Sequence, residues 1–191
     1  MQDFFGYPLI SLKKKAAYAY TILFLLNFLS YLFHPTLSCL LPFLLVLLPL
    51  VSVGKINIKF SIRQAILGLI VSLTTLIPFS LIAISLGKVF VFPSLSVLFY
   101  QLLGISFPEE TFFRGFLQNS LGNNRFGIII TSILFTATHL PRFLFFGDWT
   151  ALLTFFPSLL MGWLYMRTSN ILPSIIFHFM ANIVFVGFSG R

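Results

Sequence analysis

Acidic residues are scarce in this sequence. Only four of the 191 residues are Asp or Glu, and charged residues of both signs make up 8% of the chain. A water-soluble domain carries about a quarter of its residues as charged side chains, so this composition excludes an ordinary soluble domain. The hydrophobic share of 58% and the mean hydropathy of +1.01 predict a polytopic membrane protein with little mass outside the bilayer.

Cysteine is almost absent as well. The single cysteine, Cys39, lies in an apolar run, which excludes a disulfide framework and a cysteine-based metal site. The net charge of +8 does not indicate nucleic acid, because the basic residues are scattered at the ends of apolar segments. That distribution orients membrane proteins, so we expect the lipid bilayer, and no nucleic acid, as a partner.

Long apolar runs fill most of the chain. They predict seven membrane-spanning helices, at residues 16–33, 37–53, 65–86, 94–121, 126–140, 150–166 and 171–188. One more or one fewer span is the alternative, and residues 141–149 are expected to form a loop or a re-entrant piece. No repeat and no second domain is visible. We therefore expect residues 1–191 to form a single integral membrane domain, an all-α, polytopic transmembrane helical bundle of about seven to eight spans.

The basic residues test this topology. With the N-terminus in the cytoplasm, the inner side of the membrane holds most of them: Lys13, Lys14, Lys15, Lys55, Lys59, Arg63, Arg125 and Arg167. The outer side holds Lys88, Arg142 and Arg191. This bias follows the positive-inside rule. We expect a multi-pass protein of a membrane, most simply a prokaryotic plasma membrane, with a cytoplasmic N-terminus.

Two of the four acidic residues are adjacent and lie within the fourth span. An ionised carboxylate at the bilayer centre costs about 2.5–3.5 kcal/mol, so a pair requires a partner and indicates a function. Glu110 and Arg114 are four residues apart and share a helix face, which predicts an ion pair. Glu109 points about 100° away and is expected to remain free. Pro108 either starts a new helix, which would place both carboxylates at its N-terminus, or kinks a continuous one.

Three further polar residues lie inside predicted spans. His139 ends the fifth span, and His178 and Asn182 share one face of the seventh. A neutral imidazole beside a carboxylate can transfer protons. We expect Glu109, assisted by His139, to activate a water that attacks a peptide carbonyl. His178 and Asn182 would stabilise the resulting oxyanion.

Each of these residues also has a structural interpretation. The Glu110–Arg114 pair can serve only to neutralise itself, and the intramembrane histidines and Asn182 can bridge helices by hydrogen bonds. Two other functions use the same residues: a non-proteolytic membrane scaffold or regulator, and a proton-coupled transporter. The polar residues are confined to the last four spans and no inverted repeat is visible, which argues against a transporter.

Three motifs occur in a fixed order. Glu-Glu-x-x-x-Arg spans Glu109 to Arg114, Phe-x-x-x-His joins Phe135 to His139, and His-x-x-x-Asn joins His178 to Asn182. Together they resemble the CPBP family of intramembrane proteases, which includes CAAX prenyl endopeptidases and the bacteriocin-related Abi proteins. The resemblance covers about residues 95–185, as a catalytic core preceded by N-terminal spans within residues 16–90.

The resemblance implies a helical membrane fold, usually of about eight spans, and endopeptidase activity on a membrane-associated protein or a lipidated or peptide substrate. It implies Glu109 and His139 as the water-activating pair and His178 and Asn182 as oxyanion donors. Glu110, Arg114 and Phe135 become supporting residues. It favours a glutamic-type mechanism without a cofactor or metal, while the alternative is zinc held by the histidines, a glutamate and the asparagine.

Overall fold

The computed structural model describes residues 9–56 and 58–189, and every regular element in this part of the chain is helical. The first half contains α1 (Leu9–Leu32), η1 (Pro35–Leu40), α2 (Leu41–Val53) and α3 (Ile62–Ser85). A composite helix follows, made of α4 (Leu95–Phe99), η2 (Tyr100–Ser106), α5 (Phe107–Glu110), η3 (Thr111–Gln118) and α6 (Asn119–Leu121). The last part contains α7 (Arg125–Phe146), η4 (Trp149–Thr154), α8 (Phe155–Thr168) and α9 (Leu172–Ser189). The expected all-α helical bundle is confirmed.

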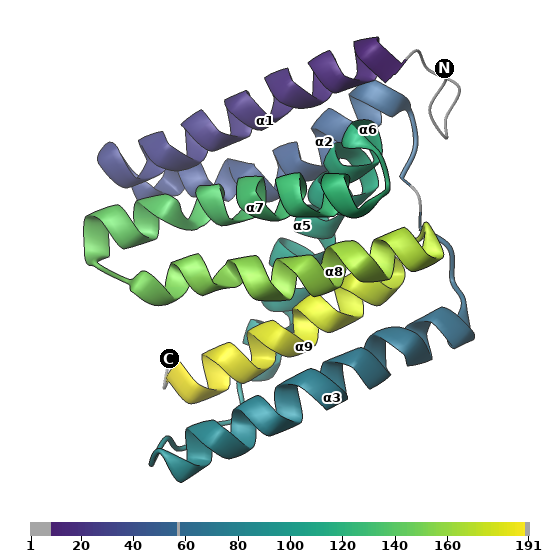
Figure 1. Ribbon diagram of the computed structural model, residues 1–191. Helices are drawn as coiled ribbons and strands as arrows, with labels where there is room; N and C mark the ends of the chain where they lie inside the picture. Colours follow the sequence, from purple (N-terminus) through teal and green to yellow (C-terminus); the bar gives the residue numbers. More distant parts are fainter. Residues whose placement is uncertain (1–8, 57, 190–191) are drawn as a thin grey trace.

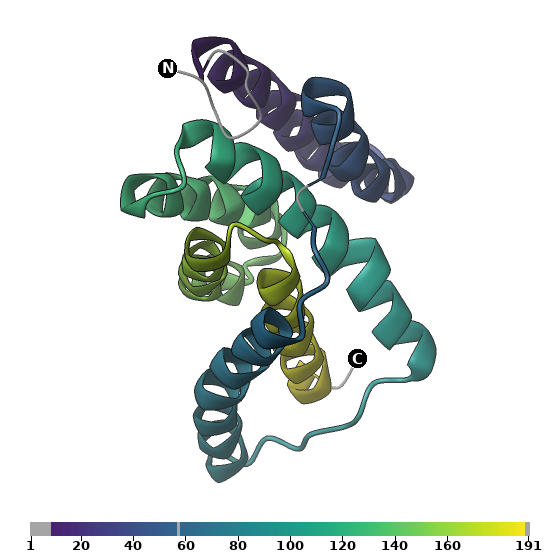
Figure 2. The same cartoon turned by 90° about the vertical axis from the view of Figure 1, so that its right-hand side faces the viewer.

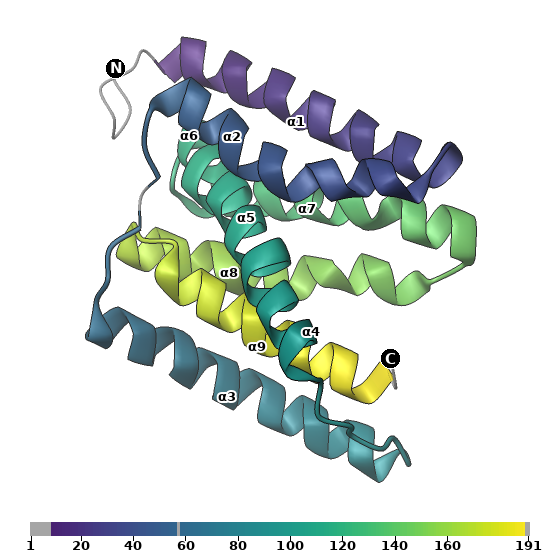
Figure 3. The same cartoon turned by 180° about the vertical axis from the view of Figure 1, so that it is seen from behind.

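The helices form a row with a second layer behind it. Figure 1 shows α1, α7, α8, α9 and α3 in that order from top to bottom. Figure 3, from behind, shows α2 beside α1 and the composite helix crossing the row. The composite helix contacts α2, α7, α8 and α9. A side chain near its middle is therefore surrounded by helices that are distant in sequence.

The composite helix is continuous. Its backbone stays in the right-handed helical region at each junction, including Phe99 and Phe107 on either side of the first π-helical stretch. Pro108 therefore does not start a new helix, and the Glu pair does not lie at a helix N-terminus. Residues 100–106 and 111–118 are wound as π-helix, whose wider turns bend helices and occur often at functional sites. Figure 2 shows the oblique course of this helix past α9.

The helix of the fifth predicted span, α7, is longer than the sequence predicts. It does not end at Leu140: α7 passes through Pro141 and ends at Phe146, where Gly147 caps it with φ of 66°. The predicted loop or re-entrant piece at 141–149 is therefore wrong over most of its length. A proline removes one helical hydrogen bond, which neighbouring groups in a membrane helix can compensate, so it is a weak end signal here. The helix continues as far as the first glycine that can adopt the left-handed cap.

Six helical stretches are long and apolar enough to cross a membrane: Ser11–Leu32, Pro35–Val53, Ile62–Ser85, Arg125–Phe146, Trp149–Thr168 and Leu172–Ser189. They correspond to six of the seven predicted spans and make the chain an integral, multi-pass membrane protein. The composite helix, with its two carboxylates and one guanidinium, remains predicted as the seventh. The cytoplasmic N-terminus and the single-domain assignment also remain predictions.

The helix α3 packs only along a narrow stripe. Its buried residues are Gly68 and Ser72, while large side chains such as Ile70 and Phe79 are exposed on its other faces. A Cβ atom placed on Gly68 would come within 2.7 Å of the carbonyl oxygen of Pro173 at the start of α9. Small residues allow two membrane helices to approach this closely, and the exposed apolar faces are left for lipid.

Candidate active site

The composite helix places Glu110 and Arg114 in the interior of the bundle. Both side chains are completely buried, and Arg114 Nε lies 3.3 Å from Glu110 Oε2. The predicted ion pair is confirmed. The two atoms meet as charges without an aligned hydrogen bond. Burial of either charge alone would be strongly destabilising, so each neutralises the other.

His178 of α9 lies between the two carboxylates. Its Nδ1 is 2.9 Å from Glu110 Oε1, which is hydrogen-bonding distance. Its Nε2 is 3.7 Å from Glu109 Oε2, beyond hydrogen-bonding distance. His178 is 6% exposed. Sequence spacing placed His178 with Asn182 and did not predict this position between Glu109 and Glu110.

Glu109 retains an unused acceptor. Its Oε2 atom is buried and has no hydrogen-bond partner, although the side chain as a whole is 22% exposed. Buried acceptors normally have a partner, so one without any marks a place where a water or substrate atom can bind. Glu109 and His139 form no direct hydrogen bond or ion pair within the described part of the chain. Their joint action on a water remains a prediction.

The hydrogen bond made by His139 orients its ring. Nδ1 lies 3.0 Å from the backbone oxygen of Phe135, one turn earlier on α7. A carbonyl oxygen can only accept, so Nδ1 is the nitrogen that carries the hydrogen. In a neutral imidazole Nε2 is then left with its lone pair exposed as a base.

Phe135 joins several of these residues. Its ring packs against His139 and, edge to face, against His178, with centroid distances of 4.9 and 5.9 Å. The guanidinium carbon of Arg114 lies 5.0 Å from the same ring centroid. Phe135 is 2% exposed. The structure therefore brings all three sequence motifs to one place. Asn182, half-buried one turn after His178, makes no side-chain hydrogen bond within the described part of the chain.

Two serines that the motifs did not indicate also belong to the site. Arg114 NH2 donates to Ser158 Oγ of α8 at 3.0 Å and to the Ser158 backbone oxygen at 3.2 Å. The Ser158 hydroxyl donates to Ser132 Oγ of α7, also at 3.0 Å. Polar residues at membrane depth were the only sequence signal for them. Serine is common enough in membrane helices that this signal is weak.

The described residues contain no group of three or more His, Cys, Asp and Glu side chains arranged to hold a metal ion. His178 faces both carboxylates, while His139 directs Nδ1 to a backbone oxygen. This arrangement does not fit a tetrahedral zinc site with a histidine-rich ligand set. The expected absence of a cofactor remains a prediction.

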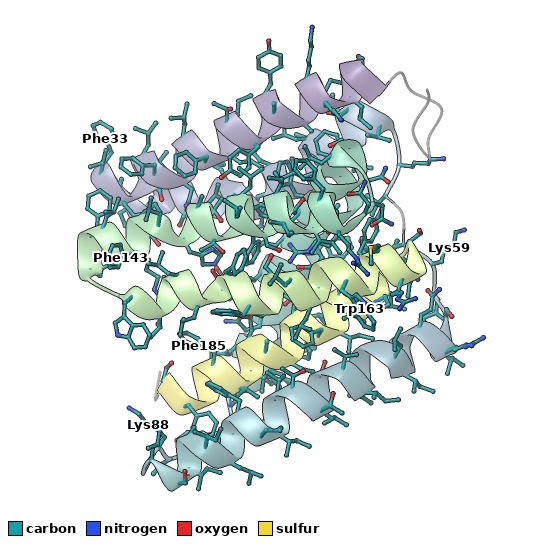
Figure 4. All side chains as sticks on the ribbon, in the orientation of Figure 1. Phe33, Lys59, Lys88, Phe143, Trp163 and Phe185 are labelled. Atoms are coloured by element: carbon teal, nitrogen blue, oxygen red, sulfur yellow. The ribbon has the colours of Figure 1, made fainter. Side chains whose placement is uncertain are left out.

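A cavity of about 1050 Å³ opens at one end of the bundle. Aromatic and charged residues line it, among them Tyr31, Lys88, Arg142, Trp149 and Phe185. Figure 4 shows Lys88 at this end and Lys59 at the opposite one. The lining of the cavity does not include the Glu pair, but Arg142 of the lining lies one turn after His139, on α7. Phe185 lies one turn after Asn182, on α9, and the Arg142 guanidinium packs 5.8 Å from its ring centroid.

Asp148 lies outside the spans and holds Arg142 in this cavity. Its carboxylate forms an ion pair with Arg142 NH2 at 2.7 Å and accepts a hydrogen bond from the Thr150 hydroxyl. The Thr150 hydrogen bond, followed by the charge of Arg142, lowers the pKa of Asp148 below its ordinary value. The pair fixes the loop between α7 and α8 at the mouth of the cavity.

Comparison with known proteins agrees with the motifs. Residues 91–184, about half of the chain, match the family model described as "Type II CAAX prenyl endopeptidase Rce1-like". Comparisons with curated proteins and with solved structures give no match. The matched stretch contains all three motifs and the two serines, Ser132 and Ser158. Through residues 91–184 the chain therefore belongs to the Rce1-like family of CAAX-type membrane proteases.

Proposed function

We propose that the chain is a glutamic-type intramembrane endopeptidase that hydrolyses a peptide bond of a membrane-associated substrate. One observation carries the proposal: Glu109 Oε2 is buried, makes no hydrogen bond, and lies 3.7 Å from His178 Nε2. A carboxylate oxygen without a hydrogen-bond partner can act as a base and accept a proton. The adjacent ring nitrogen, His178 Nε2, can donate a hydrogen bond to the oxyanion of the substrate. The membership of a protease family agrees with this chemistry.

The charges of the site balance in one simple arrangement. Glu109 and Glu110 carry two negative charges and Arg114 carries one positive charge. If the imidazole of His178 is protonated on both nitrogens, the cluster is neutral, Nδ1 donates to Glu110, and Nε2 can donate elsewhere. A neutral cluster suits a buried position, because uncompensated charge is expensive at membrane depth.

Hydrolysis then proceeds by direct attack of water. Glu109, with the free Nε2 of His139 nearby on α7, takes a proton from the water as its oxygen bonds to the scissile carbonyl carbon. The carbonyl oxygen becomes an oxyanion and accepts hydrogen bonds from His178 Nε2 and the Asn182 amide. The C–N bond breaks, and protonated Glu109 delivers its proton to the leaving amine. A general base contributes roughly 10²–10⁴-fold and one oxyanion donor roughly 10²–10³-fold.

We propose that the substrate segment reaches this site from the cavity. Arg142 and Phe185 of the cavity lie one helical turn from His139 on α7 and from Asn182 on α9. The aromatic walls suit the apolar part of a membrane-associated peptide. The family description names prenylated CAAX proteins as one class of substrate to try.

The test is cleavage by purified protein in lipid nanodiscs. A prenylated CAAX peptide and a panel of unmodified membrane-anchored peptides are incubated with wild type, Glu109→Gln and Arg167→Gln, and products are identified by mass spectrometry. Arg167→Gln is the control, because it also replaces a charge by an amide but lies exposed near the end of α8, outside the lining of the cavity. We expect Glu109→Gln to lose at least about 10²-fold in kcat, Arg167→Gln to retain activity, and a chelator to change nothing.

Three outcomes would overturn the proposal. Retention of activity in folded Glu109→Gln would remove the proposed base, and loss of activity with a chelator would establish a metal mechanism. If wild type cleaves none of the peptides, while Glu109→Gln retains a cellular phenotype or partner binding, the chain is a membrane scaffold instead.

A further inference from the structure

The hydrogen bonds around Arg114 continue away from the Glu pair to two other helices. Arg114 is fully buried, and its NH2 group donates to the Ser158 hydroxyl at 3.0 Å. Ser158 in turn donates to Ser132 at 3.0 Å. Ser158 is 0% exposed and Ser132 is 1% exposed. A buried chain of side chains therefore extends from α9 through the composite helix and α8 to α7.

The donors and acceptors of this chain have a fixed direction. A guanidinium has donors only, so the Ser158 oxygen must accept from Arg114. The single hydrogen of the Ser158 hydroxyl is then free to be donated to Ser132. On the other side of Arg114, Glu110 accepts from His178 Nδ1 at 2.9 Å. Each side chain of this chain is therefore held by the next one. The imidazole of His178 is the end of the chain that lies next to Glu109.

Most hydroxyls in these helices are used differently. Ser72 donates to the Gly68 oxygen and Thr136 to the Ser132 oxygen, both one turn earlier in the same helix. Such back-bonding is the ordinary way for a membrane helix to satisfy a hydroxyl. Ser158 instead donates to the Ser132 side chain of another helix while it accepts from a charged group. The Ser158 side chain is thus oriented by the guanidinium and by Ser132, and not by its own helix.

We propose that Ser158 and Ser132 are positioning residues for His178, acting through Arg114 and Glu110. The Ser158 hydroxyl holds the guanidinium, the guanidinium fixes Glu110 Oε2 at 3.3 Å, and the other oxygen of Glu110 fixes the imidazole so that Nε2 faces Glu109. This inference rests on the proposed function for its catalytic consequence, and on the hydrogen bonds alone for its structural one. Misplacement of a catalytic group by about 1 Å reduces rates by roughly 10²-fold.

The experiment compares Ser158→Ala, Ser132→Ala and Ser158→Thr with Ser174→Ala as the matched control. Ser174 is also 0% exposed, lies on the helix of His178, and donates across helices, at 2.8 Å, to the backbone oxygen of Met161. Within the described part of the chain its hydroxyl makes no hydrogen bond to Arg114, Ser158 or Ser132. Kinetics are measured on any peptide that wild type cleaves. Ring ¹⁵N signals of histidine-labelled protein are measured in parallel. The chain has three histidines, so His34→Asn and His139→Asn assign the spectrum.

We expect Ser158→Ala to lower kcat about 10- to 100-fold with KM within about twofold, as loss of a supporting hydrogen bond does in other enzymes. Ser132→Ala should lower kcat a few-fold. Ser158→Thr should retain most of the wild-type kcat because it keeps the hydroxyl. The His178 ring signals should move in Ser158→Ala and stay unchanged in Ser174→Ala.

Unchanged kcat and unchanged His178 signals in folded Ser158→Ala would overturn the inference. An equal loss of kcat in Ser174→Ala would also overturn it, because the effect would then be general packing. Failure of the proposed function is distinguishable: wild type would cleave nothing, or Glu109→Gln would remain active. In either case the His178 signals decide alone whether the serines position the ring.

Discussion

Two contacts between helices show how differently this protein holds itself together. Along the α3–α9 seam the helices approach through Gly68 and Ser72, with no charged side chain among the buried residues of α3. In the centre, the composite helix meets α7, α8 and α9 through Glu110, Arg114 and His178. The seam is stabilised by close backbone packing and the centre by a network of charges.

The difference shows where this fold tolerates change. Close packing between small residues fails when volume is added, but it does not depend on protonation or on a distant partner. A buried charge network fails when any one member is removed, because the remaining charge is left uncompensated. Such a network is weak as a source of stability and is therefore better explained by chemistry. Substitutions in each of the two contacts therefore have different expected effects.

Removal of the central guanidinium should have the largest effect. We expect Arg114→Ala to destabilise the protein by about 3–5 kcal/mol, because it leaves Glu110 buried without its partner. The measurement is denaturant unfolding in detergent micelles, followed by tryptophan fluorescence. Arg167→Ala is the control: Arg167 is exposed near the end of α8, over Trp163 at 5.7 Å, and its loss should cost less than about 1 kcal/mol.

A double variant sharpens this result. Glu110→Gln combined with Arg114→Ala removes both charges, so it should be more stable than Arg114→Ala alone. If the double variant is as unstable as the sum of the two single variants, the ion pair is not what determines stability in the centre.

Extra volume in the seam should have an intermediate effect. We expect Gly68→Ala to destabilise by about 1–3 kcal/mol, the usual range for overpacking, because the new Cβ would lie 2.7 Å from the rigid backbone oxygen of Pro173. Gly115→Ala is the matched control, since its Cβ would meet a methyl group of Ile171 at 3.4 Å and the Glu110 backbone oxygen at 3.9 Å, both without a severe clash. Thermal unfolding of both variants checks this. Equal melting temperatures would mean that α3 and α9 separate easily.

The smallest effect is expected at the mouth of the cavity. The pKa of Asp148 is lower in the folded protein than in the unfolded chain, first by the Thr150 hydrogen bond and then by Arg142. Its contribution to stability is therefore present above the unfolded pKa and is lost as the pH falls through the folded one. We expect Asp148→Asn to cost no more than about 1 kcal/mol at neutral pH and nothing at low pH. A cost that persists at low pH would contradict this.

Local spacing predicted the parts of the site that lie on one helix. The Glu110–Arg114 pair is an i,i+4 contact and needs no knowledge of the fold. The approach of His178 to both carboxylates was not predictable in this way, because it depends on how α9 crosses the composite helix. Ser158 and Ser132 were missed for the same reason. The end of α7 was misplaced because Pro141 was given more weight than Gly147.

The sequence by itself determined that this protein lies in a membrane, that it is helical, and that the candidate site residues are in the last four predicted spans. These conclusions follow from composition and from the cost of burying charge, which do not depend on how helices are arranged. Only the tertiary structure decided that His178 lies between two carboxylates and that one buried oxygen of Glu109 is left without a hydrogen bond. Those facts depend on crossing angles and side-chain directions between helices, which are set by packing over the whole bundle.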